Sequence, residues 1–137
     1  MVSLGLVIAQ FDKTGEVIPA MEAEATAAAD ARNATVVATV PVPGSYDAPL
    51  AADRLARRDD VDAVVAIGAI VTGETDHDQV IAQACADGLT RVSLERDTPV
   101  MLGIIGPGMT AEEAMDRVSY GAQAVHSAID FVEEHQP

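Results

Sequence analysis

The residue types best suited to chemistry gather in one polar segment of this sequence, from position 73 to position 78. Gly73 allows a close backbone approach, and Thr75 or Asp76 can cap the helix that follows, leaving backbone N–H groups free to bind an anion. Beside them, His77 carries a side chain that takes up and releases protons near neutral pH. We therefore interpret the segment as a phosphate site next to a proton-transfer residue.

The same residues have less specific interpretations. His77 could be an exposed histidine at a helix start, with no role in chemistry. Glu74, Asp76, His77 and Asp78 could also be read as metal ligands. Their spacing matches no strong ligand signature, however, so we expect no metal.

The charge balance limits which ligands the protein can bind. Twenty-two acidic residues face eight basic ones, Lys13 is the only lysine, and the formal charge is −14. This argues against nucleic acid or an anionic membrane as partner and leaves small molecules and protein partners. The acidic excess suggests adaptation to high salt, although an ordinary acidic protein would have the same composition. An anionic substrate then needs local positive charge, for which Arg117 is the best candidate, although arginines at such positions are ordinarily solvated.

Two other loops offer groups that suit an organic ligand. Phe11 could stack on a planar ring, or it could simply plug the end of the core. The segment Gly44-Ser45-Tyr46-Asp47 presents a hydroxyl, a phenol and a carboxylate, which suit a ligand with many hydroxyls. Its alternative is an ordinary helix cap, in which Ser45 or Asp47 accepts backbone N–H bonds.

Apolar runs alternate with helical patterns along the chain. Strands are predicted at 4–9, 35–40, 61–70 and 99–105, and helices at 16–32, 47–58, from 77 through 89, and from 110 onward. Thr110 and Glu113 form a capping-box signature for the last helix, whose apolar stripe runs from Met115 to Val132. We predict an α/β fold: a flavodoxin-like, doubly wound three-layer sandwich around a parallel sheet of about four strands.

The predicted strands place four loops at one edge of the sheet, at 10–14, 43–47, 70–77 and 103–110, where ligands bind in open α/β sheets. The 137 residues fit one domain, 1–137, with a frayed polar tail at 133–137. No apolar run approaches the length of a membrane span, so we expect a cytoplasmic protein. The single Cys85 is expected to be buried in a helix.

Several of these segments, in this order, resemble lumazine synthase of the archaeal type. They are the Phe11 loop, Pro43 to Asp47, Gly68 to His77, and Gly103 to Thr110 followed by Arg117 and Tyr120-Gly121. The most specific is Gly-Glu-Thr-x-His after a strand, and the resemblance runs from about Leu4 to Val132. It implies the flavodoxin-like fold, homopentamers that in some members build larger shells, and active sites between neighbouring subunits.

The resemblance also implies a reaction and roles for residues. The family joins 5-amino-6-(D-ribitylamino)uracil to L-3,4-dihydroxy-2-butanone 4-phosphate through an imine, with loss of phosphate and ring closure, and needs no metal or organic cofactor. In this chain, Phe11 would stack on the pyrimidine and His77 would move protons. The ring edge would bind the backbone of Ile70 and Val71, and the ribityl chain would lie along Ser45, Tyr46 and Asp47.

The phosphate would bind the helix start at Gly73, Glu74 and Thr75, joined by Arg117 of the adjacent subunit. Leu102 of the same neighbour would close over the ring. Two departures from the bacterial pattern concern these contacts. Asp47 stands where a glutamate is frequent, and the last helix lacks a Gly-Asn-Lys-Gly insertion that carries a lysine.

Three other functions remain open from the sequence. Archaeal riboflavin synthase has the same fold but acts on two lumazines, and it would lack the Gly-Glu-Thr-x-His and Arg117 pattern. A flavin-binding or shell-forming homologue would bind ligand without catalysis. A receiver-like signalling domain would need an acidic cluster after the first strand, where this chain has Gln10-Phe11-Asp12.

Overall fold

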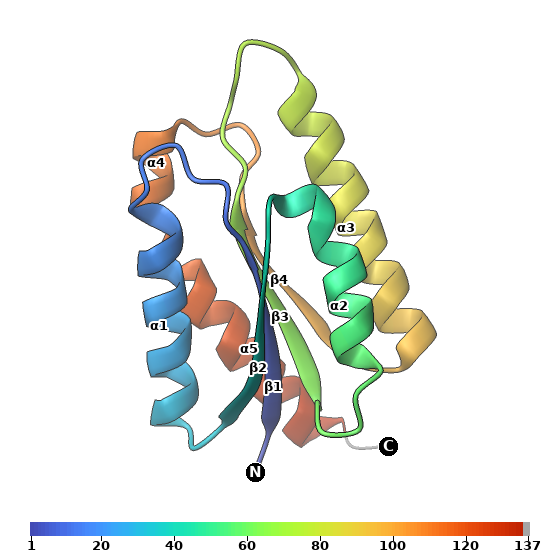
Figure 1. Cartoon of the computed structure of the whole chain (residues 1–137). Coiled ribbons are helices and arrows are strands. Elements are labelled where there is room, and N and C mark those ends of the chain that lie inside the picture. Colours follow the sequence, from blue (N-terminus) through green and yellow to red (C-terminus); the bar gives the residue numbers. More distant parts are fainter. Residues whose placement is uncertain (136–137) are drawn as a thin grey trace.

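The computed structural model describes residues 1–135 and alternates strands with helices (Figure 1). The elements are β1 (Ser3–Ala9), α1 (Val17–Ala31), β2 (Thr35–Val42), the 3-10 turn η1 (Ser45–Asp47), α2 (Ala48–Ala56), β3 (Ala63–Ala69), α3 (His77–Arg96), β4 (Val100–Ile105), α4 (Ala111–Met115) and α5 (Tyr120–Glu134). The four strands are parallel in the order β2-β1-β3-β4. The predicted α/β, flavodoxin-like arrangement is confirmed.

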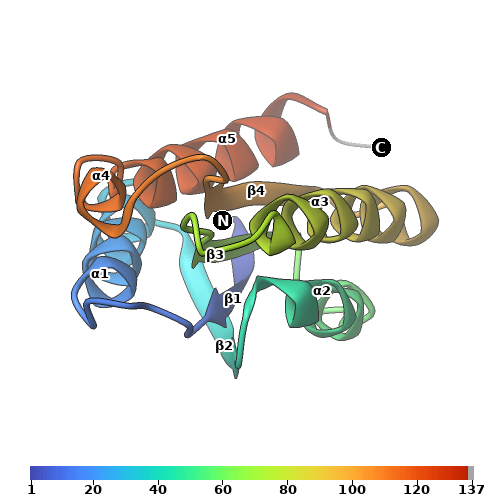
Figure 2. The ribbon, with the colours of Figure 1, turned by 90° about the horizontal axis from the view of Figure 1, so that it is seen from above.

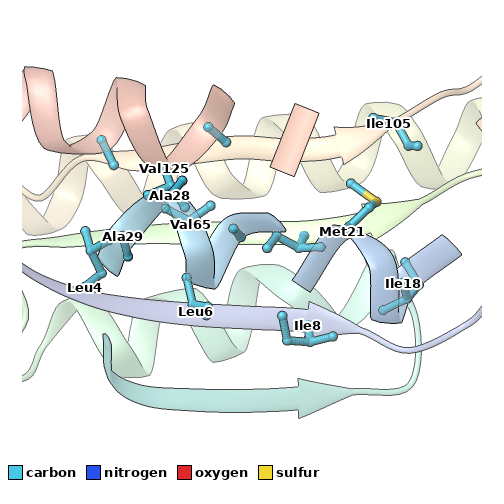
Figure 3. Packing of buried hydrophobic residues seen from close by; sticks show 14 of the residues in the cluster. Leu4, Leu6, Ile8, Ile18, Met21, Ala28, Ala29, Val65, Ile105 and Val125 are labelled. Carbon is cyan, nitrogen blue, oxygen red and sulfur yellow. The ribbon is translucent and has the colours of Figure 1, made fainter. Parts of the chain in front are cut away.

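Helices cover both faces of the sheet, and the alternation of side chains along the strands explains why both are apolar. In β1, Leu4, Leu6 and Ile8 pack towards α1 and α5, whereas Val7 and Ala9 pack towards α2 and α3. Figure 2 shows the two pairs of helices on opposite sides of the sheet, and Figure 3 shows the first of these cores. Because both faces are covered, β1 and β3 are almost wholly buried, which is why they read as continuous apolar runs.

The strand order decides where a ligand can bind. From β1 the chain continues to β2 on one side of the sheet's centre, whereas from β3 it continues to β4 on the other side. The connection after β1 therefore covers one face of the sheet and the connection after β3 covers the other, which makes the gap between β1 and β3 a switch point. A crevice forms at such a point, outside the carboxyl ends of the strands. The outer strands, β2 and β4, are the edges, and on β4 the side chain of Leu102 is 56% exposed.

The prediction of one final helix with an apolar stripe from Met115 was wrong. Two helices, α4 and α5, replace it, and between them Asp116, Arg117 and Tyr120 each bond the carbonyl three residues back. The residues at the break include Ser119, a poorer helix former. The stripe starts at Val118, which packs on the core, and not at Met115, which is 43% exposed. The Thr110–Glu113 capping box is confirmed, with bonds of 3.0 and 3.1 Å.

Three further expectations concern the chain as a whole. Cys85 is buried as predicted, and burial raises the pKa of its thiol to about 11. Of the tail expected to fray, Glu133 and Glu134 lie in α5, while positions 136 and 137 lie outside the described residues. No helix within residues 1–135 is long and apolar enough to cross a membrane.

Candidate active site

A cavity of about 460 Å³ lies at the carboxyl ends of β1, β2 and β3. It is bounded by the loop after β1, by η1 with the turn before it, and by the segment that joins β3 to α3. Nine of the residues predicted for the site line it: Phe11, Ser45, Tyr46, Asp47, Ile70, Val71, Gly73, Thr75 and His77. Three of the four predicted loops therefore converge; the fourth, at 103–110, does not line this cavity.

Phe11 stands at the cavity rim and not at the end of the core. Its side chain is 59% exposed, so plugging the core does not explain it. The loop that carries it is fixed by Asp12, whose carboxylate accepts the backbone N–H of Ile18 at 2.8 Å and both the N–H and the hydroxyl of Thr14. Burial would raise the pKa of Asp12, but these hydrogen bonds lower it below its ordinary value.

The wall formed by η1 combines a buried hydroxyl with exposed polar groups. Ser45 is 7% exposed and packs on Gly68 of β3, where an added Cβ would lie 2.9 Å from the Ser45 Oγ. Asp47 accepts the backbone N–H of Gly44 at 3.1 Å, so the turn supports itself as the helix-cap interpretation expected. Because Asp47 and Tyr46 are also exposed and line the cavity, the turn can additionally present them to a ligand.

The segment that leads into α3, beside the cavity, has unused N–H groups. The Thr75 hydroxyl accepts the backbone N–H of His77 at 3.2 Å, and the Asp76 side chain makes no capping bond. Within the described chain, the backbone N–H groups of Glu74, Thr75 and Asp76 donate no hydrogen bond. Three free donors at the positive end of a 20-residue helix form an anion-binding arrangement, next to the exposed His77 imidazole.

The backbone beyond β3 is held by the end of β4 and the loop that follows it. Ile70 donates to the Ile105 carbonyl at 2.8 Å, and Thr72 donates to the Met109 carbonyl at 2.8 Å. Gly106 packs so closely on the Ile70 carbonyl that a side chain could not be accommodated there. Between these anchors the N–H of Val71 donates to no described group, so it is available to the edge of a planar ring.

Three predicted site residues do not line the cavity. Glu74 lies in the loop beside it, and Leu102 lies on the β4 edge in a groove that also contains Tyr120. Arg117 follows α4, which stands at the cavity's end of the sheet but on the α1 and α5 side (Figure 1). Its only ion pair in residues 1–135 is with Glu113 at 3.9 Å, a partly exposed pair of little energetic weight.

The cavity also contains residues that the sequence did not single out for it. Asp78 and Ile81 line it from α3, although Asp78 was considered only as a metal ligand and Ile81 not at all. The signal for Ile81 was its position four residues after His77, which places both on one face of a helix. No three His, Cys, Asp or Glu side chains in residues 1–135 are grouped so that they could hold a metal ion.

Comparison with known proteins places this chain among enzymes of one kind. A family model described as 6,7-dimethyl-8-ribityllumazine synthase matches residues 1–136. A protein of that name from Halorubrum lacusprofundi is 62% identical over 135 residues, which are 98% of each chain. Another from Halobacterium salinarum is 60% identical over 98% of this chain and 99% of its own. One from Methanocaldococcus jannaschii is 45% identical over 96% of this chain and 92% of its own.

Proposed function

Because the chain belongs to the 6,7-dimethyl-8-ribityllumazine synthase family, and so is a transferase of riboflavin biosynthesis, we propose that the cavity at the carboxyl end of its sheet is the active site. There 5-amino-6-(D-ribitylamino)uracil condenses with L-3,4-dihydroxy-2-butanone 4-phosphate. The amine forms an imine with the ketone and releases water, phosphate is then eliminated, and the ring closes with release of a second water. The observation that carries the proposal is the free N–H cluster at the start of α3 beside His77.

The two substrates fit opposite parts of the cavity. The phosphate binds the N–H groups of Glu74 and Thr75, which supply positive potential that a chain of charge −14 otherwise lacks. Phe11 stacks on the pyrimidine, whose edge meets the backbone of Ile70 and Val71. The ribityl chain runs along η1.

His77 transfers protons during imine formation and phosphate elimination. It lines the cavity next to the phosphate site, where the leaving oxygen and the carbon that loses a proton lie together. Imine formation between an amine and a ketone needs little covalent help, so most of the rate enhancement comes from holding the two substrates in contact. The proposed reaction uses no metal or organic cofactor.

A neighbouring copy of the chain completes the site. Leu102 is exposed on an edge strand, and Arg117 is connected to Tyr120 of the same groove by a 3.1 Å backbone bond. Both therefore lie near one groove on the α5 side of the molecule, and neither lines the cavity of its own chain. We propose that this side packs on the cavity of a neighbour in a homopentamer, where Arg117 meets the phosphate and Leu102 covers the ring.

The proposed setting is a salt-rich cytoplasm. The net charge of −14 produces self-repulsion, which a Debye length of about 3 Å at 1 M salt screens. The relatives from Halorubrum and Halobacterium, whose genus names denote salt, share 60–62% of the residues. We expect pentamers to form only when that repulsion is screened.

The proposal is tested by measuring lumazine formation from the two substrates at low salt and at high salt. The high-salt condition is roughly 2–3 M KCl, at which charge is fully screened. We expect the protein to form lumazine much faster than the same mixture without protein, and the Arg117→Ala variant to lose this acceleration. No gain at any salt concentration would contradict the proposal and favour a flavin-binding or shell-forming protein. Riboflavin formed from lumazine as sole substrate would favour riboflavin synthase.

A further inference from the structure

A charged residue, Asp78, is buried at the start of α3, where it lines the cavity. The buried residues of this helix are Asp78, Cys85, Leu89 and Val92. The last three pack on the sheet and α2, whereas Asp78 lines the cavity. Asp78 is only 8% exposed, and with Ser45 it makes up the buried polar residues within the described chain. A buried carboxylate needs hydrogen-bond donors. No side-chain oxygen of the described residues is both sealed from solvent and without a partner, so the Asp78 oxygens obtain theirs either from the protein or through the cavity that Asp78 lines.

The protein itself supplies no such partner. Within residues 1–135 the Asp78 carboxylate forms no hydrogen bond or ion pair. Its place in the first turn of α3 favours negative charge through the helix dipole, but the side-chain bond at this terminus comes from Thr75. The carboxylate therefore keeps its full capacity to accept hydrogen bonds.

Hydrogen-bond acceptors and donors lie in different parts of the cavity. Asp78 and Ser45, the two buried polar side chains, both line it, and α3 packs on η1. This side is rich in acceptor oxygens, whereas the loop before α3 offers N–H donors. A complementary ligand has an anionic group at the loop and several hydrogen-bond donors at the α3–η1 side.

We propose that Asp78 is a specificity-determining residue that accepts hydrogen bonds from the hydroxyl groups of the ribityl chain. This rests on the proposed function, since it assigns a further contact to one substrate of that reaction. The ribityl hydroxyls supply the hydrogen-bond donors that the protein does not offer to the Asp78 carboxylate.

The test measures binding to the full-length protein, without the second substrate, in wild type, Asp78→Leu and Asp78→Asn. The ligands are 5-amino-6-(D-ribitylamino)uracil and its 6-pentylamino analogue, which has no hydroxyls. We expect Asp78→Leu to weaken binding of the ribityl ligand about 10-fold or more and to leave the pentyl ligand unchanged or tighter. Asp78→Asn, which keeps the size and one acceptor, should lie between. Asp87→Asn on the exposed side of α3 is the control for charge.

Equal weakening of both ligands would overturn the proposal, because a purely structural role affects both alike. An unchanged affinity for the ribityl ligand in a folded variant would overturn it as well. If Asp78→Leu fails to fold, the affinities of Asp78→Asn for the ribityl and pentyl ligands, each relative to wild type, decide instead. Since binding is measured without condensation, wild type that binds but makes no lumazine contradicts only the proposed function.

Discussion

Replacing Gly68 by alanine should damage both the fold and the wall of the cavity. An added Cβ would lie 2.9 Å from the Oγ of Ser45, 3.0 Å from the Cβ of Ala9 and 3.4 Å from the Cγ1 of Ile104. Ala9 belongs to the buried β1, so the strain cannot be relieved by rotating one flexible side chain. Overpacking of this kind costs about 1–3 kcal/mol. For a domain of this size that corresponds to a fall in Tm of roughly 3–15 °C.

Thermal unfolding followed by circular dichroism measures the effect. The control is Gly73→Ala, where an added Cβ meets nothing within 4 Å, so its Tm should stay close to that of wild type. Adding Ser45→Ala to Gly68→Ala removes the closer contact and should restore part of the lost stability. A Tm for Gly68→Ala within about 1 °C of wild type would refute the reasoning.

Three other predictions concern catalysis by His77, the pH dependence of stability and the effect of salt on stability. His77→Ala should lower kcat by roughly 10²-fold without abolishing lumazine formation, and total inactivity with intact substrate binding would contradict it. Asp12→Ala should cost about 1 kcal/mol in urea unfolding at pH 7, because the Ile18 N–H loses its acceptor. The lowered pKa of Asp12 stabilises the fold above about pH 4, so the difference between the two proteins should shrink as the pH falls towards 3, and a constant difference would refute the assignment. Raising KCl from 0.1 to about 2 M should raise Tm, whereas a flat or falling Tm would argue against salt adaptation.

The sequence predicted the elements that local pattern determines. Strands buried on both faces are continuous apolar runs, as at β1 and β3, and the capping box at Thr110 is a local arrangement of two residues. Because parallel strands end at the same edge of a sheet, the convergence of Phe11, Ser45 and His77 followed from the strand assignments alone. The break before α5 was missed because tight turns continue a helical spacing for several residues.

The rest of the site depends on contacts between distant segments. The burial of Asp78 follows from how α3 packs on η1, and a carboxylate next to a histidine at a helix start reads as a surface residue. The structure of a single subunit gives Arg117 and Leu102 no place in the site, because neither lines the cavity of its own subunit. Their proposed roles came from the resemblance and require a second copy.

Subunit complementation tests the composite site most directly. In one variant, Thr75→Trp fills the cavity from an exposed position, and in the other, Arg117→Ala removes the cation. When the two are unfolded together in equal amounts and reassembled, a site between neighbours receives an intact cavity and an intact arginine in about a quarter of cases. We predict that the mixture recovers about a quarter of the wild-type rate of lumazine formation, while each variant alone stays nearly inactive. A mixture as inactive as its parts, with assembly intact, would contradict the account.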